Sequence, residues 1–302
     1  MHRSSSPPPG VAWPATCESN GAWSVEYLLA DQDVRCLAAD PIHLGVVYAG
    51  MQGQGVLRSD DRGGTWSPPG LDGRIVKALA VSPTELGVVY AGTKPPLLFV
   101  SHDGGTNGTE LEAFRRIPGR WWLLSPAEWP PVAYVQGIVL APTDPNVIVV
   151  GVEAGAMVRS KDGGETWSGH RPGAVRDCHS IAFHATSGDW VYEGGGTGAG
   201  VSQDDGTTWQ QPRAGLDRRY CWACAADPAR PDVWYVSAAL LFTPTNPLVP
   251  TAHVDGKANA SIFRRIGSEP WRKLAGGLPQ PLSYMAYVLL TDPAAPGHLY
   301  AG

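Results

Sequence analysis

The stretch at residues 58–66, R-S-D-D-R-G-G-T-W, decides the fold because it recurs along the chain. It returns at 159–167 as R-S-K-D-G-G-E-T-W and at 201–209 as V-S-Q-D-D-G-T-T-W. A copy without the Trp begins at Val100 as V-S-H-D-G-G-T. Self-similarity at a fixed spacing is the mark of a repeat architecture. We therefore read the chain as a series of structural repeats.

The spacing of these boxes sets the size of the repeat. Ser59 and Ser101 are 42 residues apart, as are Ser160 and Ser202, and the 59 residues between Ser101 and Ser160 indicate an insertion. A second phrase precedes the boxes: an apolar run, a turn with Pro, and a second run ending near Gly. Its first copy is C-L-A-A-D-P-I-H-L-G-V-V-Y-A-G, and the copies lie at 36–50, 78–92, 138–151, 181–194, 224–237 and 289–302. Repeats of about 40–45 residues with four strands are typical of β-propeller blades.

The two ends of the chain complete this count. The sixth phrase supplies only the first two strands of its blade, and residues 10–13 and 24–29 are candidates for the other two, around a worn box at 16–23. The sequence therefore predicts an all-β fold, a six-bladed β-propeller with four-stranded antiparallel blades and a last blade closed by both chain termini. Residues 1–9 are predicted to be a disordered tail, and 10–302 a single propeller. The alternative is a truncated chain without its final strands.

Each box is interpreted as a turn between the third and fourth strands of a blade. An Asp side chain accepts backbone N–H bonds in such a turn, and Gly adopts a positive φ without steric cost. We therefore expect Asp60, Asp103, Asp162 and Asp204 to be structural and not catalytic. In a four-stranded blade the box turn and the long loops lie on opposite faces. Insertions at about 118–133 and 238–260 then both lie on the loop face, where function is more often carried.

The pattern S-x-D-x-G-x-T-W with Y-A-G upstream resembles the Asp-box, or bacterial neuraminidase repeat, family. The resemblance covers nearly the whole chain and implies a propeller. It implies less about activity, because similar boxes occur in sialidases, xyloglucan-cleaving glycosidases, sortilin-type receptors and photosystem assembly factors. Function must therefore be argued from a site.

Composition excludes several classes of protein. The chain has 302 residues, a formal net charge of -5 and a pI near 5.9, without the basic domain that nucleic-acid binding requires. It has no run of 18 apolar residues, so we expect no membrane span. The five Cys are an odd number and the N-terminus lacks the apolar core of a signal peptide, so we expect free thiols and a cytoplasmic protein.

Aligning the first strand of every blade on its turn Pro yields a candidate pocket. Six positions before the turn, every residue is polar or aromatic, which suits a pocket mouth at the central channel. These residues are Arg35, Lys77, Gln136, His179, Trp222 and Tyr287, and two positions earlier lie Asp33, Ile75, Tyr134, Asp177, Tyr220 and Met285. The first insertion adds Trp121, Trp122 and Trp129. The alternative is that these side chains only line a water-filled channel.

From this set we predict roles for particular residues. The catalytic candidates are Asp33, Asp177, Glu153 and Tyr287. The ligand-binding candidates are Arg35, Lys77, Tyr134, Gln136, Arg176, His179, Arg219, Tyr220 and Trp222. A general glycosidase needs two carboxylates on either side of the scissile bond.

The sialidase members of the resemblance imply a more specific site. Arg35, Arg176 and Arg219 would clamp a carboxylate, with Tyr287 or Tyr220 as nucleophile, Glu153 or Glu193 as its partner, and Asp33 or Asp177 as acid. The Arg-Ile-Pro signature of that group is absent from the first blade, where the strand is V-R-C-L-A. The similar F-R-R-I-P at 114–118 is expected on a fourth strand, so it is a different feature.

No cofactor is predicted, although His179 and His253, with Asp177 and Cys178, are a candidate metal site. Cys221 and Cys224 form a C-x-x-C on a predicted strand, so their thiols should point to opposite faces and serve packing. The first functional hypothesis is recognition of a small polar molecule or carbohydrate at the channel mouth, with glycosidase-type hydrolysis as an extension. The alternatives are a non-catalytic scaffold or assembly factor that binds protein through the loop face, and a metal-dependent enzyme using His179 and His253.

Overall fold

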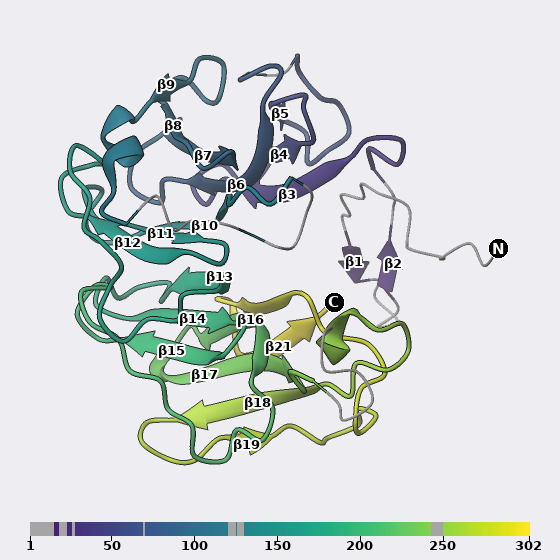
Figure 1. Ribbon diagram of the computed structural model, residues 1–302. Helices are drawn as coiled ribbons and strands as arrows, with labels where there is room; N and C mark the ends of the chain where they lie inside the picture. Colours follow the sequence, from purple (N-terminus) through teal and green to yellow (C-terminus); the bar gives the residue numbers. More distant parts are fainter. Residues whose placement is uncertain are drawn as a thin grey trace. The chain divides into compact units, whose positions relative to one another are not determined.

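The computed structural model describes residues 15–17, 23–25, 28–68, 70–119, 125, 130–242 and 250–302, and its strands pair in antiparallel sheets (Figure 1). The tail at 1–9, the strand expected at 10–13, and Trp121, Trp122 and Trp129 lie outside the described residues. The chain divides into two compact units, Met1–Leu111 and Glu112–Gly302.

The N-terminal unit contains two complete repeats. Its sheets are β3 (Val34–Ala39), β4 (Val47–Met51) and β5 (Val56–Ser59), and β6 (Ile75–Val81), β7 (Val89–Lys94), β8 (Leu98–Ser101) and β9 (Thr109–Glu110). Two short strands, β1 (Ala15–Cys17) and β2 (Trp23–Val25), pair antiparallel. Both strands overlap the expected worn box at 16–23, and β2 begins one residue before the strand predicted at 24–29.

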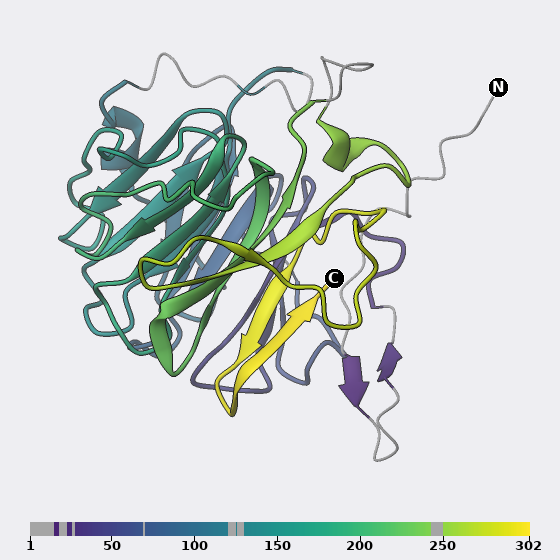
Figure 2. The same cartoon turned by 90° about the horizontal axis from the view of Figure 1, so that it is seen from below.

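The C-terminal unit continues with sheets in chain order (Figure 1). They are β10 (Val135–Leu140), β11 (Ile148–Val152) and β12 (Ala156–Ser160); β13 (Cys178–Phe183), β14 (Val191–Gly195) and β15 (Gly198–Ser202); and β16 (Tyr220–Asp227), β17 (Arg230–Ala239), β18 (Ser261–Ile266) and β19 (Arg272–Lys273). The last two strands, β20 (Leu289–Asp292) and β21 (Ala295–Ala301), pack against β16 and appear in yellow in Figure 2.

The prediction of four strands in each blade is correct for two sheets and wrong for three. The sheets of β6–β9 and β16–β19 have four strands, whereas those beginning at β3, β10 and β13 have three. The fourth segment of the shorter sheets makes only scattered bonds, such as the bridge between Val201 and Gln210. Pro68, Pro172 and Pro212 follow closely after the box in these segments, and Pro cannot donate to a ladder.

Apolar side chains between successive sheets form the core of the C-terminal unit. Met157, Val149, Cys178 and Trp209 are buried together where the β10–β12 and β13–β15 sheets meet. The next interface buries Tyr192, Trp234, Phe263 and Trp271, among others. Each sheet therefore has two apolar faces, as expected for strands covered on both sides.

The box turns are built as the sequence predicts, with one correction. In the third box Ser160 donates to Asp162, while Asp162 accepts from the backbone and hydroxyl of Thr166. In the first box Asp61 has this role, because it stands two residues after Ser59 as Asp162 does after Ser160. Asp60, which we expected in the turn, instead pairs with Arg58 at 2.6 Å on the surface.

A second correction concerns residues 114–118, which we expected on a strand. Glu112–Arg116 form a 3-10 helix. Phe114 on this helix is buried and contacts the Trp167 ring edge-on, with centroids 5.1 Å apart. The apolar contact therefore favours a compact turn over an extended strand here.

A β-bulge recurs in the first strand of five sheets, at the position that the alignment selected. The register shifts at Arg35, Lys77, Gln136, His179, and the pair Trp222–Ala223. A bulge leaves a residue unpaired and redirects its side chain. The predicted row of polar and aromatic residues is therefore a row of bulge residues, except Tyr287, which lies before β20 and not on a strand.

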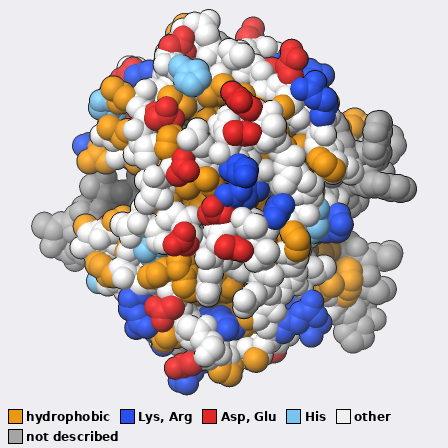
Figure 3. Space-filling view, turned by 90° about the vertical axis from the view of Figure 1, so that its left-hand side faces the viewer, with side chains coloured by type: hydrophobic (Ala, Val, Ile, Leu, Met, Phe, Trp, Pro, Cys, Tyr) orange, Lys and Arg blue, Asp and Glu red, His pale blue; other side chains and the backbone are white. Residues whose placement is uncertain are grey.

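Two further observations concern the surface. On the face drawn in Figure 3, acidic and basic side chains are interspersed, in agreement with the net charge of -5. Among the described residues no helix combines the length and apolar character needed to cross a bilayer.

Candidate functional site

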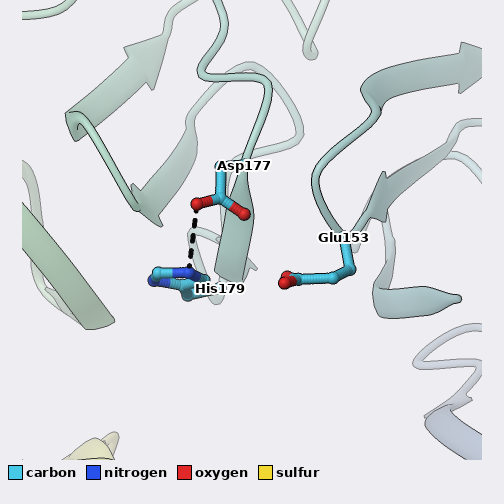
Figure 4. A group of neighbouring side chains, drawn as sticks. All are labelled: Glu153, Asp177 and His179. Carbon is cyan, nitrogen blue, oxygen red and sulfur yellow. Dashed lines mark ion pairs between the residues drawn. The ribbon is translucent and has the colours of Figure 1, made fainter. Parts of the chain in front are cut away.

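Three side chains of the C-terminal unit form an acidic cluster with a histidine (Figure 4). Glu153 follows β11, Asp177 directly precedes β13, and His179 is the bulge residue of β13. One oxygen or nitrogen atom from each residue lies within 4.8 Å of the others. We call these three residues the acid–His cluster.

His179 is held firmly in this cluster. Its Nδ1 lies 2.8 Å from the carbonyl oxygen of Cys221. Its ring stacks on Trp222 with centroids 4.4 Å apart, and Tyr220 lies at 4.9 Å in a tilted contact. Gln136, the bulge residue of β10, donates its amide to the carbonyl of His179 at 2.9 Å. The side chain at each of these bulges therefore hydrogen-bonds to the backbone of the first strand in the following sheet, from β10 to β13 and from β13 to β16.

Asp177 faces the other nitrogen of this imidazole. Its Oδ2 lies 3.5 Å from His179 Nε2, and about a third of its side chain is exposed to solvent. Burial raises the pKa of Asp177, but the interactions with His179, together with those of the Ala154 backbone and Glu153, outweigh burial, so the pKa is lowered and the group is a carboxylate. Burial lowers the pKa of His179, but Asp177, together with the Cys221 carbonyl and Glu153, outweighs that effect and the pKa is raised.

Glu153 is buried and comes from a different element. Ser125 donates its hydroxyl to Glu153 Oε1 at 3.4 Å, and the backbone N–H of Glu153 donates to the carbonyl of Tyr134. The Glu153 carboxylate points toward His179 and Asp177 (Figure 4). No pattern in the sequence indicated Ser125, because its contact with Glu153 joins residues that are 28 positions apart in the chain.

Aromatic rings border the acid–His cluster. Tyr220 and His253 are joined by a hydrogen bond of 2.7 Å between the hydroxyl and Nε2, and the Trp222 ring meets the Tyr287 ring edge-on at 5.0 Å. Burial raises the pKa of Tyr220 and of Tyr287, and the carboxylates of Asp177 and Glu153 raise that of Tyr220 further. Neither phenol is thus activated as an anion, which disfavours the nucleophile role that we predicted for Tyr287.

His253 was a predicted metal ligand together with His179. Its Nε2 bonds to the Tyr220 hydroxyl. Among the described residues, the side chains that lie close enough together to share a metal ion are those of Glu153, Asp177 and His179, without His253. Tyr287 donates its hydroxyl to the carbonyl of Ala252, beside His253. His253 therefore contributes to the aromatic border.

The other predicted residues have different partners. Arg176 is exposed and donates to the carbonyl of Gly155, and Arg219 is also exposed. Arg176 lines a hollow of about 630 Å³ with Pro118, Gly119, Ala154, Gly155, Ala156, Gly169 and His170. Asp33, Arg35 and Lys77 belong to the N-terminal unit, where Asp33 and Arg35 pair with each other at 2.9 Å.

The prediction for the C-x-x-C pair is wrong in one respect. Cys221 and Cys224 are buried in the same apolar cluster, because the bulge at Trp222–Ala223 adds a residue and restores both thiols to one face. Burial raises the pKa of both thiols. The cysteines whose side chains are described, Cys36, Cys178, Cys221 and Cys224, are free.

Glu193, an alternative partner for a catalytic Tyr, lies within β14 and outside the acid–His cluster. It is fully buried, and its Oε2 accepts the backbone N–H of Val175 at 3.0 Å. Its other oxygen has no partner among the described residues. Glu193 is therefore a core residue.

Repeated antiparallel sheets of three or four strands, each opening with a bulged strand, define this all-β chain as a β-propeller. Solved structures agree. The chain is similar to the GH74 xyloglucanase from Xanthomonas campestris, with a TM-score of 0.65, 18% identity, and coverage of 89% of this chain and 43% of that one. An ancestral GH74 enzyme has a TM-score of 0.64 and 22% identity, covering 87% and 33%. The Niastella koreensis GH74 enzyme has a TM-score of 0.60 and 18% identity, covering 86% and 42%.

The chain spans about a third to two fifths of the length of these enzymes. At such identities the likeness shows the fold alone. Neither a protein-family model nor a curated protein sequence matches the chain.

Proposed function

We propose that the C-terminal unit binds a carbohydrate at the acid–His cluster. The observation that carries this proposal is the border of aromatic rings, Tyr220, Trp222, His253 and Tyr287, around the buried carboxylate of Glu153 and the partly exposed carboxylate of Asp177. Sugars present C–H faces that pack on aromatic rings, and hydroxyl groups that donate to carboxylates. Ligand sites typically combine such an apolar wall with a few polar groups.

The name of one similar enzyme, the xyloglucanase from Xanthomonas campestris, supports this class of ligand. Xyloglucan oligosaccharides are therefore the first probes, beside a panel of neutral and acidic sugars. Ligand binding would use Trp222 and Tyr220 as packing surfaces and Asp177 as the solvent-facing acceptor. Gln136 and Tyr134 would position the cluster through the backbone of His179 and Glu153.

Tyr287→Ala tests the binding proposal. Tyr287 is 42% exposed and its ring meets Trp222, so truncation should remove a packing surface and weaken binding about 10-fold, which is about 1.4 kcal/mol. Isothermal titration with the bound sugar measures the change. Tyr284→Ala is the control, because Tyr284 is a more exposed Tyr of the same segment. If no sugar of the panel binds the wild-type chain, the proposal fails.

Hydrolysis is a second candidate function, favoured by the spacing of the two carboxylates. Retaining glycosidases hold their carboxyl groups about 5–5.5 Å apart, and oxygens of Glu153 and Asp177 lie within 4.8 Å of each other. The ionised Asp177 would be the nucleophile and Glu153 the acid. His179 would orient Asp177 through their ion pair.

Asp177→Asn tests hydrolysis. Removal of the nucleophile should lower the release of reducing ends from the bound oligosaccharide by about 10³-fold or more, while the Kd for the sugar changes less. Glu153→Gln should have a similar effect. Asp189→Asn, at an exposed turn, is the control. Unchanged turnover in both cluster variants would show that other residues catalyse the reaction.

The scaffold alternative requires a flat apolar loop face. At this end of β13 and β16, Asp177 faces the His179 imidazole, and the Tyr220 hydroxyl bonds to Nε2 of His253. This arrangement favours a polar ligand over an apolar protein surface.

We also propose that the propeller has six blades, with the last completed by both termini. The strands β3, β6, β10, β13, β16 and β20 each begin a repeat, which supports the count. An experimental structure with another number of blades would overturn it.

A further inference from the structure

The tautomer of His179 is fixed by its backbone partner. Nδ1 lies 2.8 Å from the Cys221 carbonyl oxygen, which can only accept, so Nδ1 carries a hydrogen. In a neutral imidazole the lone pair is then on Nε2. Nε2 is the atom that faces Asp177 Oδ2. A lone pair facing a carboxylate is repulsive, so either a proton on Nε2 or a metal ion must lie between the two atoms.

The distance between these atoms discriminates between two kinds of cation. Charge-assisted N–H···O bonds are about 2.7–2.9 Å long, whereas His179 Nε2 and Asp177 Oδ2 are 3.5 Å apart. Two ligands of a tetrahedral zinc ion, each about 2.0–2.2 Å from it, are about 3.3–3.5 Å apart. The separation is thus long for a proton bridge and suits a shared metal ion.

The surroundings supply the rest of such a site. Glu153 brings a third ligand atom within 4.8 Å, and Asp177 Oδ1 is buried without a hydrogen-bond partner among the described residues. Metal-binding histidines usually donate their second ring N–H to a carbonyl or carboxylate, as His179 does to Cys221. Trp222 and Tyr220 fix the plane of the imidazole.

From this geometry we propose that Glu153, Asp177 and His179 bind one divalent transition-metal ion, Zn²⁺ or Mn²⁺. One imidazole and two carboxylates form a borderline ligand set, whereas Mg²⁺ and Ca²⁺ favour oxygen ligands throughout. Three protein ligands leave a coordination position for water or a ligand hydroxyl. The ion would lie between the two carboxylates, which would then be metal ligands. With the metal bound, Asp177 and Glu153 would therefore not act as the nucleophile and acid of the hydrolysis candidate above. The metal site uses the same residues as carbohydrate binding but does not depend on it.

The test is a titration of the full untagged chain with metal alone. After removal of bound ions with a chelator and dialysis, ZnCl₂ and MnCl₂ are titrated calorimetrically. We expect one ion per chain for at least one of the two salts. Asp177→Asn and Glu153→Gln should each weaken that affinity at least about 10-fold. His170→Gln is the matched control, since the imidazole of His170 accepts from the backbone of Met157 and is not part of the cluster.

Circular dichroism and melting curves establish that each variant is folded. Should one cluster variant fail to fold, the other decides the assignment. The absence of saturable binding of either ion by the wild-type chain overturns the proposal, whatever the variants do. Wild-type affinity in the folded cluster variants overturns it as well, since the ion then binds elsewhere. If the chelator-treated protein binds sugar but neither metal ion, the metal proposal is wrong and the proposed carbohydrate binding still holds.

Discussion

At the scale of single residues, the box turns depend on one carboxylate that serves several donors. Asp162 accepts from Ser160, from the Thr166 hydroxyl and from the Thr166 backbone. Ser160 in turn accepts the backbone N–H of Gly164 at 2.9 Å. The same pattern holds Asp204 with Ser202 and Thr208. These bonds explain why the sequence repeats Ser, Asp, Gly and Thr at fixed spacing without any catalytic role.

The turn carboxylates make stability depend on pH in the acid range. The hydroxyl of Thr166, followed by its backbone N–H, lowers the pKa of Asp162 to about 2 from an ordinary value near 4. Because the folded pKa lies below the unfolded one, the contribution is complete above about pH 4 and is lost as pH falls toward 2. Asp162→Asn should melt at a lower temperature than wild type at pH 6.

The difference between the two proteins should shrink between pH 4 and pH 2. Melting curves recorded from pH 2 to pH 7 measure this. Asp189→Asn, which changes an exposed Asp outside the boxes, is the control. A difference that stays constant down to pH 2 would contradict the proposed role of the carboxylate.

At the scale of elements, the bulged first strand is the unit that prepares the site. In β13 the bulge places His179 outside the ladder, and in β16 it spans Trp222. The side chains of Gln136 and His179 then reach the backbone of the next first strand. In five sheets the position selected by alignment on the turn Pro coincides with the bulge, because these repeats place their bulge at about the same distance from the turn. The alignment did not indicate the bulge itself, and so the side chains of Cys221 and Cys224 were assigned to opposite faces.

β14, the second strand of the β13–β15 sheet, contains a buried acid, Glu193, that should make stability depend on pH. Burial raises the pKa of Glu193 to about 8, against the lowering effect of the Val175 N–H. A raised folded pKa favours the folded state at low pH, and this advantage is lost as pH rises from about 4 to 8. Wild-type stability should therefore fall over this range, whereas Glu193→Gln should be much less sensitive.

Urea unfolding at pH 5 and pH 8 measures the effect as a change in the free energy of unfolding. Glu193→Gln should be the more stable of the two proteins at pH 8. Glu165→Gln, at an exposed position of the third box, should follow the wild type at both pH values. Equal pH dependence in Glu193→Gln and wild type would mean that Glu193 is ionised in the fold.

At the scale of the whole molecule, loops connect each sheet of the C-terminal unit to the next. The carbonyl of Pro172 accepts the backbone N–H of Trp209, and that of Ala214 accepts the N–H of Trp271. Gly173 and Gly215 follow with positive φ of 81° and 82°. A Cβ at these positions would lie 2.0 Å from Trp209 O and 2.3 Å from Trp271 O. Glycine therefore permits the close approach of one blade's loop to the box Trp of the next.

Gly173→Ala should consequently destabilise the unit. The left-handed conformation alone costs a non-Gly residue about 1–2 kcal/mol, and the clash with Trp209 adds to this. Thermal melting of this variant against Gly276→Ala measures the effect. A Cβ at Gly276 would meet no other atom within 4 Å, so its substitution should be nearly neutral. Equal melting temperatures for the two variants would show that the loop can shift at little cost.

The sequence by itself determined the repeat, the turns and the positions in each first strand that carry polar or aromatic side chains. These features are local, because a Ser–Asp–Gly–Thr turn bonds within its own few residues and alternation follows from strand geometry. Only the tertiary structure decided which of the aligned residues meet. Glu153 approaches His179 from a different sheet, and Phe114 prefers a helical turn because Trp167 lies beside it. Contacts of this kind depend on packing between sheets, where the sum of many distant interactions sets each distance.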